Sequence, residues 1–594
     1  MLSRSLLLLL LLTACGDDDP PPLADGSVDL AMEAGADAGT DIAVEMAADT
    51  AAADMFVVEP PPSCPALPEV APPACGSGPV ARGSLIPGPA DDAFDAALAA
   101  KAFDYDRAFH AIFALHTGVN TEVRVPDAAD RETIRRFFEE HEGWDLAAFA
   151  ESEVADMVSW NKVAGAYGGV GAAADAFRYA VLRDEGAACE DVERARSHVR
   201  AALGGVRRAF QVTGEPGIIA RGYQRNDVPG NPVEIVPLFD ESGAPLPAEK
   251  DNGTWRADNS GALPEYDWED SCSRDMIIGW VVGIAALWEV MERDPTFTDE
   301  ERAGLRGDAQ LLANSLMEVR EEGRDLEIWD ADGRRTFHGT LHESAIESVY
   351  LDFSINAQHA IMSLGIMSAL ARVTGDEAVS SYVHNELVRR RRIHELVRDM
   401  VGGVIDFEEA TNYSNYNMAY NGAWLANRYL CGDEARTLVS DGITSDLYEG
   451  RPPEEIGQSF FDFTYLATRT GATVGASGDA ASVNEALTRG LATLNGFPAP
   501  PFWNENVENC DAAEIEAGEC TAIDGETLIT LSDTLGRGDN PVSTTPLPMS
   551  IRPPSNFYWR SDPYRVNSPG NGQSLFPGVD FRMAYWIGRY LRVE

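Results

Sequence analysis

The sequence predicts a mainly α-helical body, and two observations support this prediction. About a dozen segments have the length and apolar periodicity of helices, whereas few stretches have the alternation typical of strands. The helices are also of two kinds. Met276–Met291 and Ile355–Ala371 are apolar on nearly every side, whereas Arg302–Glu321 and Glu386–Val401 have one charged side. Apolar helices are buried and amphipathic helices cover them, so we expect two layers of helices.

The composition excludes several classes of protein. Among 594 residues, 44% are apolar and 11 are Trp, enough for a large core, so the whole chain is not disordered. The net charge of -50 argues against nucleic acid as a partner, because phosphate binding requires concentrated Lys and Arg. It favours neutral or cationic partners instead. The longest apolar run after the N-terminus, Met276–Trp288, is too short to span a bilayer.

The N-terminus reads as a targeting segment. Arg4 precedes the apolar run Leu6–Leu12, and small residues follow it. The ending Leu12-Thr13-Ala14-Cys15 resembles the lipobox of bacterial lipoproteins. This resemblance implies that residues 1–14 are removed and that Cys15 is acylated, which anchors the protein in a membrane. The expected location is the bacterial cell envelope, with the outer membrane or cell surface favoured over the inner membrane.

Residues 15–62 are expected to form an acidic tether. The stretch 16–62 holds twelve acids and no Lys or Arg, and from Asp25 to Asp49 an acid recurs at every fourth residue. On a helix these acids would repel one another, so we expect an extended linker that ends in Pro60-Pro61-Pro62. Residues 63–594 show no break in composition and are expected to form a single domain.

The cysteines predict disulfides, because the protein is expected outside the cytoplasm. Seven cysteines remain after Cys15. Spacing along the chain favours two local bridges, and a third is possible, with one cysteine left over. The two local bridges are Cys64–Cys75 and Cys510–Cys520. The possible third is Cys189–Cys272, which leaves Cys431 without a partner.

The body is read in order as helices joined by loops. A glycine-rich stretch, Gly168–Gly171, is expected to break the helical pattern, and Gly217–Arg274 is expected to be a long irregular loop. Expected strands are Val233–Leu238 and the hairpin Asp325–Trp329 with Arg335–Leu341. Expected helices are Asp92–Thr117, Asp130–His141, Asp145–Ala166, Ala172–Asp184, Asp191–Val212, Asp275–Glu292, Asp299–Glu322, Ser354–Val373, Glu377–Val401, Tyr416–Leu430, Glu454–Thr468, Ala480–Leu494 and Val579–Arg592.

The alternation of buried and covering helices resembles the (α/α)6-toroid, or six-hairpin, superfamily over about residues 90–594. The segments Thr213–Tyr223 and Pro577–Tyr590 are also similar to parts of toroid-like secreted proteins. The resemblance implies an (α/α) toroid of helical hairpins with a few short strands and long cleft loops. Many members of the superfamily cleave glycans at one end of the ring, where inner-helix termini meet loops. The alternative is a different α-solenoid.

The loop before the Asp275 helix combines carboxylates with aromatic rings. Rings stack on sugars and carboxylates bind their hydroxyls, so this segment is a candidate glycan site. Asp275 is the candidate acid or base, and a hydrolase needs a second carboxylate across the bond. The bland alternative for Asp275 is a helix cap. Candidate partners are Asp227, Asp267, Glu269 and Asp270, and candidate sugar-binding residues are Arg221, Tyr223, Trp255 and Trp268.

Three further clusters are candidates. In His338–Glu343, His342 is a candidate catalytic residue, although it could instead bond neighbouring loops. Asn415 lies in the amide- and phenol-rich Asn412–Asn417, and Trp559 in the aromatic Asn556–Arg565. Each of these two segments could equally have a structural role, in capping a helix or sealing the fold.

The leading hypothesis is a surface-tethered glycan hydrolase that acts on a neutral glycan with Asp275 and a carboxylate such as Asp227 or Glu269. No metal or cofactor is expected, because ligand spacings and nucleotide or nucleophile motifs are missing. One alternative is a non-catalytic glycan- or protein-binding lipoprotein. The other is a polysaccharide lyase, which requires a basic cleft with His342 or Tyr416 and with Arg221, Arg225 or Arg560.

Overall fold

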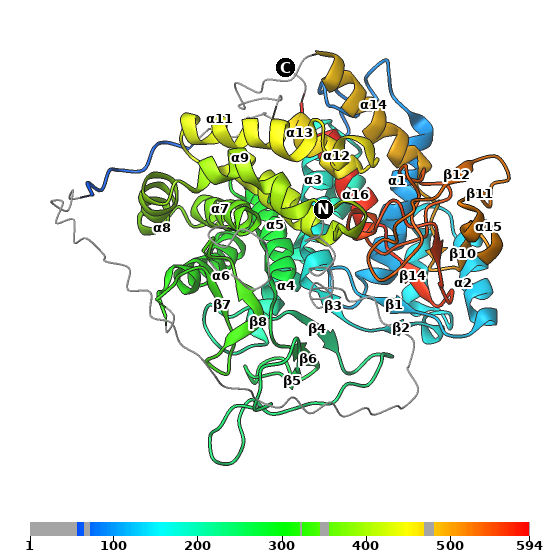
Figure 1. Ribbon diagram of the computed structural model, residues 1–594. Helices are drawn as coiled ribbons and strands as arrows, with labels where there is room; N and C mark the ends of the chain where they lie inside the picture. The colour runs from blue at the N-terminus through cyan, green and yellow to red at the C-terminus, as the bar shows by residue number, and fades with distance from the viewer. Residues whose placement is uncertain (1–55, 65–71, 321–322, 345–355, 469–479, 593–594) are drawn as a thin grey trace, which may run out of the picture. The chain divides into compact units, whose positions relative to one another are not determined.

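The computed structural model describes residues 56–64, 72–320, 323–344, 356–468 and 480–592. The chain divides into two compact units, Met1–Pro60 and Pro61–Glu594. The anchor candidate Cys15 and most of the expected tether lie outside the described residues. The second unit is mainly α-helical, as the sequence predicts (Figure 1).

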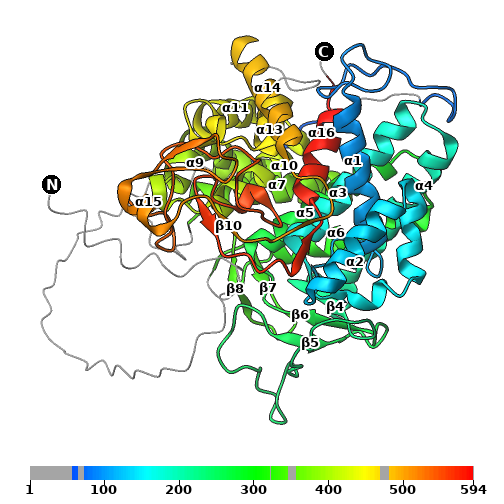
Figure 2. The same ribbon diagram turned by 90° about the vertical axis from the view of Figure 1, so that its right-hand side faces the viewer.

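Six helices form the buried centre of this unit, and Figures 1 and 2 show them grouped together. Nearly every residue in them is shielded from solvent, as expected for helices that are apolar or uncharged on most sides. They are α3 (Gly165–Asp184), α5 (Arg274–Met291), α7 (Ala357–Thr374), α10 (Tyr413–Tyr429), α13 (Ser459–Ala467) and α16 (Val579–Tyr590).

Contacts between the central helices show that they run parallel. Residues near the start of one helix pack on residues near the start of its neighbour. Early in α3, Gly165 packs on the first turns of α5, and Gly169 packs one turn further on both helices. A Cβ at Gly169 would lie 1.8 Å from the carbonyl oxygen of Gly279. Further contacts join α3 to α16, α7 to α10, α10 to α13, and α13 to α16. All six N-terminal ends therefore lie on one side.

The remaining helices cover this centre and alternate with it along the chain. α1 packs on α16, α4 on α3, α6 on α7, α9 on α7, α11 on α10 and α14 on α13. Their charged sides face outward, as the amphipathic pattern predicts. The bounds are α1 (Ala96–Ala108), η2 (Phe109–Phe113), α2 (Ala128–Glu140), η3 (Gly143–Glu151), η4 (Ala155–Met157), α4 (Cys189–Gln211), α6 (Asp299–Met317), α8 (Glu377–Ser381), η5 (Tyr382–Arg390), α9 (Ile393–Ile405), η6 (Glu408–Ala410), α11 (Asp433–Gly442), η7 (Ile443–Tyr448), α12 (Pro452–Glu455), α14 (Ala480–Gly496), α15 (Ala512–Ala517) and η8 (Tyr558–Arg560).

Short strands form small antiparallel sheets at the edge of the helical centre. Two sheets have four strands, in the orders β2-β1-β14-β9 and β3-β4-β6-β5, and three are two-stranded pairs, β7-β8, β10-β13 and β11-β12. The bounds are β1 (Val123–Arg124), β2 (Ser159–Trp160), β3 (Val163–Ala164), β4 (Gly222–Arg225), β5 (Trp255–Ala257), β6 (Tyr266–Glu269), β7 (Glu327–Trp329), β8 (Arg335–Thr340), β9 (Phe502–Trp503), β10 (Val507–Glu508), β11 (Glu519–Thr521), β12 (Leu528–Thr530), β13 (Asn567–Ser568) and β14 (Ser574–Phe576).

Several expected elements differ. Asp145–Ala166 is not one helix but two 3₁₀ turns and two short strands. The glycines of Gly168–Gly171 do not break the pattern, because α3 runs through them and uses them to approach α5. The loop Gly217–Arg274 contains β4, β5 and β6, whereas Val233–Leu238 is not a strand.

The other boundaries agree more closely. The β7-β8 hairpin is confirmed. The expected helix Glu377–Val401 is interrupted at Arg392, and Glu454–Thr468 is interrupted at Gly457; both residues have positive φ. The start of Ser354–Val373 and the end of Asp299–Glu322 lie partly outside the described residues. α11 and α15 were not expected.

Two of the expected disulfides are wrong. Cys64 pairs with Cys431 and Cys75 with Cys189, over separations of 367 and 114 residues, and only the local pair Cys510–Cys520 is confirmed. The buried Cys272, rather than Cys431, stays outside the disulfides of the described residues. Spacing misled here because two described segments, residues 61–64 and 72–91, bind the ends of distant helices; these two segments are called the strap.

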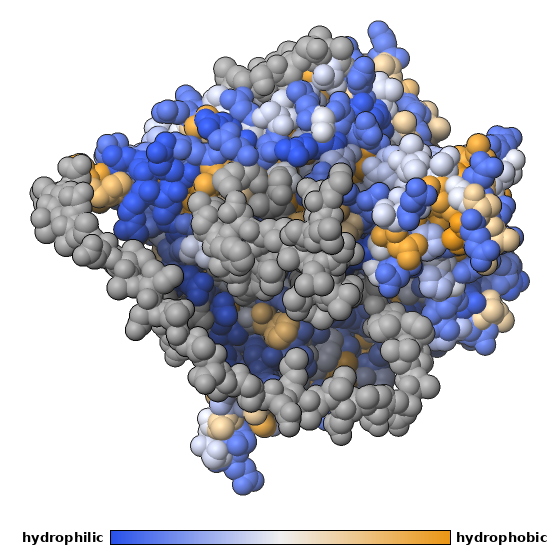
Figure 3. Space-filling model, in the orientation of Figure 1, coloured by the Kyte–Doolittle hydropathy of each residue, from blue (hydrophilic) through white to orange (hydrophobic). Residues whose placement is uncertain are grey.

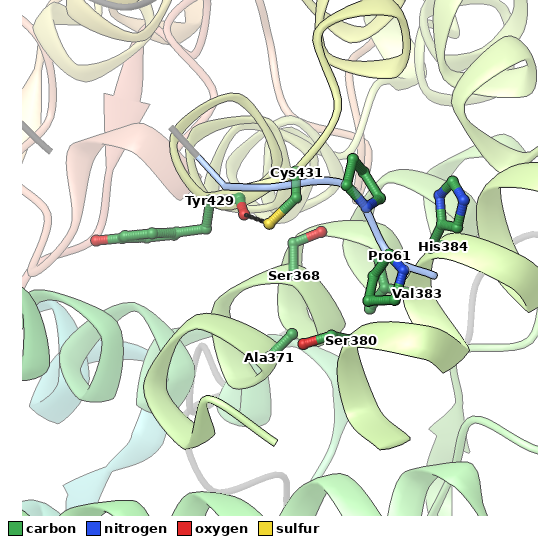
Figure 4. Close-up of a pocket in the computed structure, with 9 residues that line it drawn as sticks. Pro61, Ser368, Ala371, Ser380, Val383, His384, Tyr429 and Cys431 are labelled. Atoms are coloured by element: carbon green, nitrogen blue, oxygen red, sulfur yellow. Dashed lines mark hydrogen bonds between the residues drawn. The ribbon is translucent and has the colours of Figure 1, made fainter. Parts of the chain in front are cut away.

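The strap passes a small pocket where Pro61 and Pro62 meet the ends of α7 and α10. Ser368, His384 and Cys431 are among the residues around it (Figure 4). Elsewhere, Figure 3 shows hydrophobic residues on the side where Figure 1 places β11, β12 and α15. Within the ranges that the structure describes, no helix is long and apolar enough to cross a membrane.

Candidate functional site

The side chain of Arg560 joins three central helices at their N-terminal ends. Its Nη1 donates to the hydroxyl of Tyr167 on α3 at 2.8 Å, and its Nε donates to Oγ of Ser414 on α10 at 3.3 Å. Its Nη2 lies 3.9 Å from Oδ2 of Asp275 on α5. These contacts bring together residues that lie up to 393 positions apart in the sequence.

Asp275 is the second residue of α5 and is held as an anion. The N-cap is Ser273, which makes no side-chain cap bond; its hydroxyl instead donates to Oδ1 of Asp275 at 2.5 Å. Burial would raise the pKa of Asp275, but the charges of Arg560 and Arg221 and the Ser273 hydroxyl hold it below its usual value. The carboxylate is therefore part of a charge cluster and does not serve only as a helix cap.

A second carboxylate, Glu269, connects to Asp275 through Arg221. Nη1 of Arg221 donates to the Ser273 hydroxyl at 2.7 Å, and its Nε lies 3.5 Å from Oε2 of Glu269. Lys162 reaches the same Glu269 oxygen at 2.5 Å. The β4-β6 pairing places this group, because Gly222, next to Arg221, lies opposite Glu269 in register.

His338 on β8 completes the cluster with a neutral imidazole. Burial lowers the pKa of this half-buried side chain to about 4, and the charge of Arg274 lowers it further. Asp275 opposes that effect, and Arg221 adds to it. Lys162, Arg221, Arg274 and Arg560 thus lie in or beside one cluster with the carboxylates of Asp275 and Glu269.

His342, the histidine predicted from sequence, belongs to a different group. Its two ring nitrogens each lie 3.6 Å from a carboxylate, of Asp325 and of Glu343. Arg391 binds both of these acids. The ion pairs tie η5 to the end of the β7-β8 hairpin, which fits the structural alternative for His342.

Three predicted sugar-binding rings are buried in the core. Tyr223 and Trp268 have 0% exposure and face each other across β4 and β6. Their polar atoms are satisfied by the carbonyls of Gly205 and Ala257. Trp559 is equally buried and stacks on Phe460 at 4.4 Å. None of these rings offers a face to a ligand in this structure, because all three are packed inside the core.

The other predicted residues divide between the cluster and its surroundings. Asp227 is exposed and paired with Arg225, so it is not joined to Asp275. Trp255 is half-exposed and lies opposite Glu269 on the neighbouring strand. Asn415 follows Ser414, and its carbonyl accepts from Gln358 on α7 at 3.3 Å.

Tyr167 was missed in the sequence. It lies between the expected helix Asp145–Ala166 and the expected break Gly168–Gly171, so the sequence pattern assigns it to no helix. A tyrosine within the first turn of a buried helix indicates a candidate site residue. Its hydroxyl lies near the end of the helix layer, where a ligand could meet it.

The turn Asp330–Gly333 begins with the Asp-x-Asp-Gly pattern of a calcium-binding loop. Its two aspartates instead bind the side chain of Lys250. Nζ of Lys250 lies 3.0 Å from Asp270, 2.6 Å from Asp330 and 3.2 Å from Asp332. Asp330 also accepts the backbone N–H of Ser271 at 2.6 Å, which fixes the turn that leads to Asp275. Among the described residues, no group of three or more His, Cys, Asp or Glu side chains could hold a metal ion.

Comparisons with protein-family models, with curated proteins and with solved structures found no significant match to this chain.

Proposed function

We propose that residues 61–594 form an (α/α) toroid of helical hairpins. The proposal is supported by six buried parallel helices that alternate with covering helices along the chain. It is further supported by the contacts of α3 with both α5 and α16, which make the first and last central helices neighbours. Such a ring collects the N-terminal ends of its central helices on one side, where Asp275, Tyr167 and Ser414 lie.

We propose that Cys15 carries the lipid that tethers this body to the bacterial cell envelope, in the outer membrane or at the cell surface. The lipobox-like Leu12–Cys15 supports the anchor. Three disulfides in the described residues support an oxidising compartment outside the cytoplasm. Palmitate labelling of the expressed protein, and its loss in Cys15→Ser, tests this.

We propose that the protein is a carbohydrate-active enzyme whose centre is the Asp275–Arg560–Tyr167 cluster. The observation that carries the proposal is the position of Arg560, which joins an anionic Asp275, a phenol and a serine hydroxyl at the ends of three central helices. The guanidinium groups of Arg560 and Arg221, which can bind carboxylates in a planar geometry, favour a glycan that carries carboxylates. This differs from the neutral glycan favoured by the overall charge, because these two side chains carry the opposite sign.

Cleavage of an acidic glycan by elimination fits these groups best. In this reaction a base removes the proton beside the sugar carboxylate, the bond to the leaving oxygen breaks and a carbon–carbon double bond forms. Arg221 and Arg560 would stabilise the charge that develops on the carboxylate. The neutral His338 would accept that proton as the base, and the Tyr167 hydroxyl would donate a proton to the leaving oxygen. A proton transfer from His338 back to Tyr167 would then restore both groups.

Hydrolysis is the second candidate, and the link between Asp275 and Glu269 favours it. Arg221 and Ser273 connect the two carboxylates, so both face one charge cluster. An anionic Asp275 suits the base that activates water, rather than the acid. In that case Glu269 would have to supply the proton to the leaving sugar.

The test uses the purified protein on polygalacturonate, alginate and hyaluronan, with xylan and β-glucan as neutral substrates. Ultraviolet absorbance of unsaturated uronates reports elimination, and new reducing ends without absorbance report hydrolysis. Arg560→Gln should lower either activity by about 10²–10³, whereas Arg225→Gln, an arginine whose partner is the exposed Asp227, should not. Binding of a glycan without any product would favour the non-catalytic alternative.

A further inference from the structure

A second group of polar and aromatic side chains lies next to the Asp275–Arg560 centre. Tyr413, the first residue of α10, has its ring centroid 6.3 Å from that of Tyr564. Tyr416, one turn further along α10, stacks on Tyr413 at 5.9 Å. Two segments that lie about 150 residues apart in the sequence thus meet through their tyrosines.

Two residues of this group, Asp562 and Tyr564, are partly exposed to solvent, where a ligand could reach them. Tyr564 and Asp562 are half-buried, whereas Tyr413 is 5% exposed and lies beneath them. Oδ1 of Asp562 accepts the backbone N–H of Tyr564 at 2.9 Å, which fixes the carboxyl beside the ring. Burial raises the pKa of Asp562 to about 6, so this carboxyl can donate or accept a hydrogen bond near neutral pH.

Two buried polar groups around these rings have an unused hydrogen-bonding atom. The Tyr416 hydroxyl and Nη1 of Arg552 have no hydrogen-bond partner among the described residues, and both residues are at least 95% buried. Arg552 donates its other N–H groups to the carbonyls of Leu547 and Ile456.

The charge of Arg552 is also unbalanced. Among the residues that the structure describes, it forms no ion pair, although Asp562, Tyr413 and Tyr564 are close enough to act on its charge. A buried cation without a paired carboxylate is costly, and such unsatisfied groups mark places where a ligand or water supplies the missing oxygen.

The group adjoins the proposed catalytic centre along the chain. Ser414, which binds Arg560, follows Tyr413 directly, and Asp562 lies two residues after Arg560. The chain therefore leads from the residues that bind Arg560 directly into this group, on α10 and on the loop after η8.

We propose that Tyr413, Tyr564 and Asp562 form a sugar-binding subsite beside the Asp275–Arg560 centre. Tyr564 stacks on a sugar ring and Asp562 binds its hydroxyls, while the charge of the buried Arg552 acts on both from behind. This inference rests on the proposed function, because the subsite binds a unit of the same glycan chain. Its ligand class is a pyranose unit next to the one that is cleaved.

The experiment measures kcat and KM on oligosaccharides of three and six units from whichever of the five polysaccharides the wild-type protein cleaves. Tyr564→Ala and Asp562→Asn should each raise KM about tenfold with little change in kcat. The effect should be larger on the longer oligosaccharide. Tyr564→Phe, which keeps the ring, should retain most of the affinity and guards against a folding defect in the alanine variant. Phe239→Ala, at an exposed ring in a distant loop, is the control and should change neither constant.

The outcomes separate the two claims. A wild-type protein that cleaves a glycan with unchanged KM in both subsite variants would overturn the subsite and leave the proposed function standing. A wild-type protein that neither binds nor cleaves any of the five polysaccharides would overturn the proposed function and the subsite with it. A drop in kcat alone, with KM unchanged, would also contradict a binding subsite.

Discussion

Arg560 is the residue on which the proposed site depends most. Its three contacts reach α3, α5 and α10, so its loss removes both positive charge and the geometry of the cluster. Removing a cation that stabilises developing charge typically costs about 10²–10³ in kcat. We therefore expect Arg560→Gln to lower kcat by about that factor, and Arg560→Lys to recover only part of it, because lysine lacks the planar fork.

Two titrating groups predict the pH dependence of activity. The pKa of His338 is about 4, and Asp275 is held below its usual pKa, so both are deprotonated at neutral pH. Protonation of either changes the charge of the site, so kcat/KM should fall as the pH decreases toward 4. In His338→Gln, kcat should fall by about 10²–10⁴ because the base is lost; an unchanged rate and pH profile would exclude His338 as the base.

At the scale of elements, glycines set the distance between α3 and α5. Gly169→Ala places a methyl group against the Gly279 carbonyl, so we expect a loss of about 3 kcal/mol or more in unfolding free energy. Gly204→Ala is the matched control. This glycine is exposed on α4 with nothing within 4 Å of a Cβ, and its replacement should stabilise by about 1 kcal/mol. Denaturant unfolding of both variants tests the close approach of the helices.

A buried charge network joins α1, α3, α4 and α16. Arg582 binds Asp106 and Asp175, and the rings of His110 and His198 stack at 3.4 Å beside them. Burial lowers the pKa of both histidines; for His198 the neighbouring His110 and Arg178 lower it further, and for His110 the partner Asp175 opposes the shift. The folded state thus holds neutral histidines, whereas the unfolded chain takes up protons below about pH 6.5.

The free energy of unfolding should therefore keep the full contribution of these two histidines above about pH 6.5. It should decrease as the pH falls below that value. Each such histidine contributes a slope of about 1.4 kcal/mol per pH unit. Measuring unfolding free energy from pH 7.5 to 5 in wild type and His198→Gln tests this. The variant should show a shallower slope, and equal slopes would contradict the prediction.

The two ends of the central helices differ across the whole molecule. The N-terminal ends carry the Arg560 cluster, whereas near the C-terminal ends Glu289 binds Arg428, Tyr429 and Tyr590. The strap also crosses that end, where Leu85 bonds to the carbonyl of Leu591. The disulfides Cys64–Cys431 and Cys75–Cys189 fix the strap there, so it lies on the opposite end from the proposed site.

Removing the long-range disulfides should destabilise the protein more than removing the local one. In the loop-entropy model, a bridge that closes more than 100 residues is worth about 4–5 kcal/mol, and a ten-residue loop less. Cys75→Ser with Cys189→Ser should therefore lower Tm more than Cys510→Ser with Cys520→Ser. Equal losses would indicate that the strap adds little to stability.

The helical layers could be predicted from the sequence, whereas the site could be predicted only in part. Met276–Met291 is apolar all round and is indeed buried as α5, and Asp275, Arg221 and Glu269 were found because they flank that helix. Arg560 and Tyr167 meet across 393 residues, and no local pattern encodes such a contact. Tyr223 and Trp268 misled because an aromatic residue near a carboxylate looks the same whether its ring faces a ligand or the core.

The central claim is that the Arg560 cluster cleaves an acidic glycan by elimination. The most direct measurement is digestion of polygalacturonate, alginate and hyaluronan in water labelled with heavy oxygen, followed by mass spectrometry of the products. We expect unsaturated products without the label, and about 10²–10³ times slower formation of them with Arg560→Gln. Saturated products that carry one labelled oxygen would show hydrolysis and contradict the claim, as would intact glycans after incubation with folded protein.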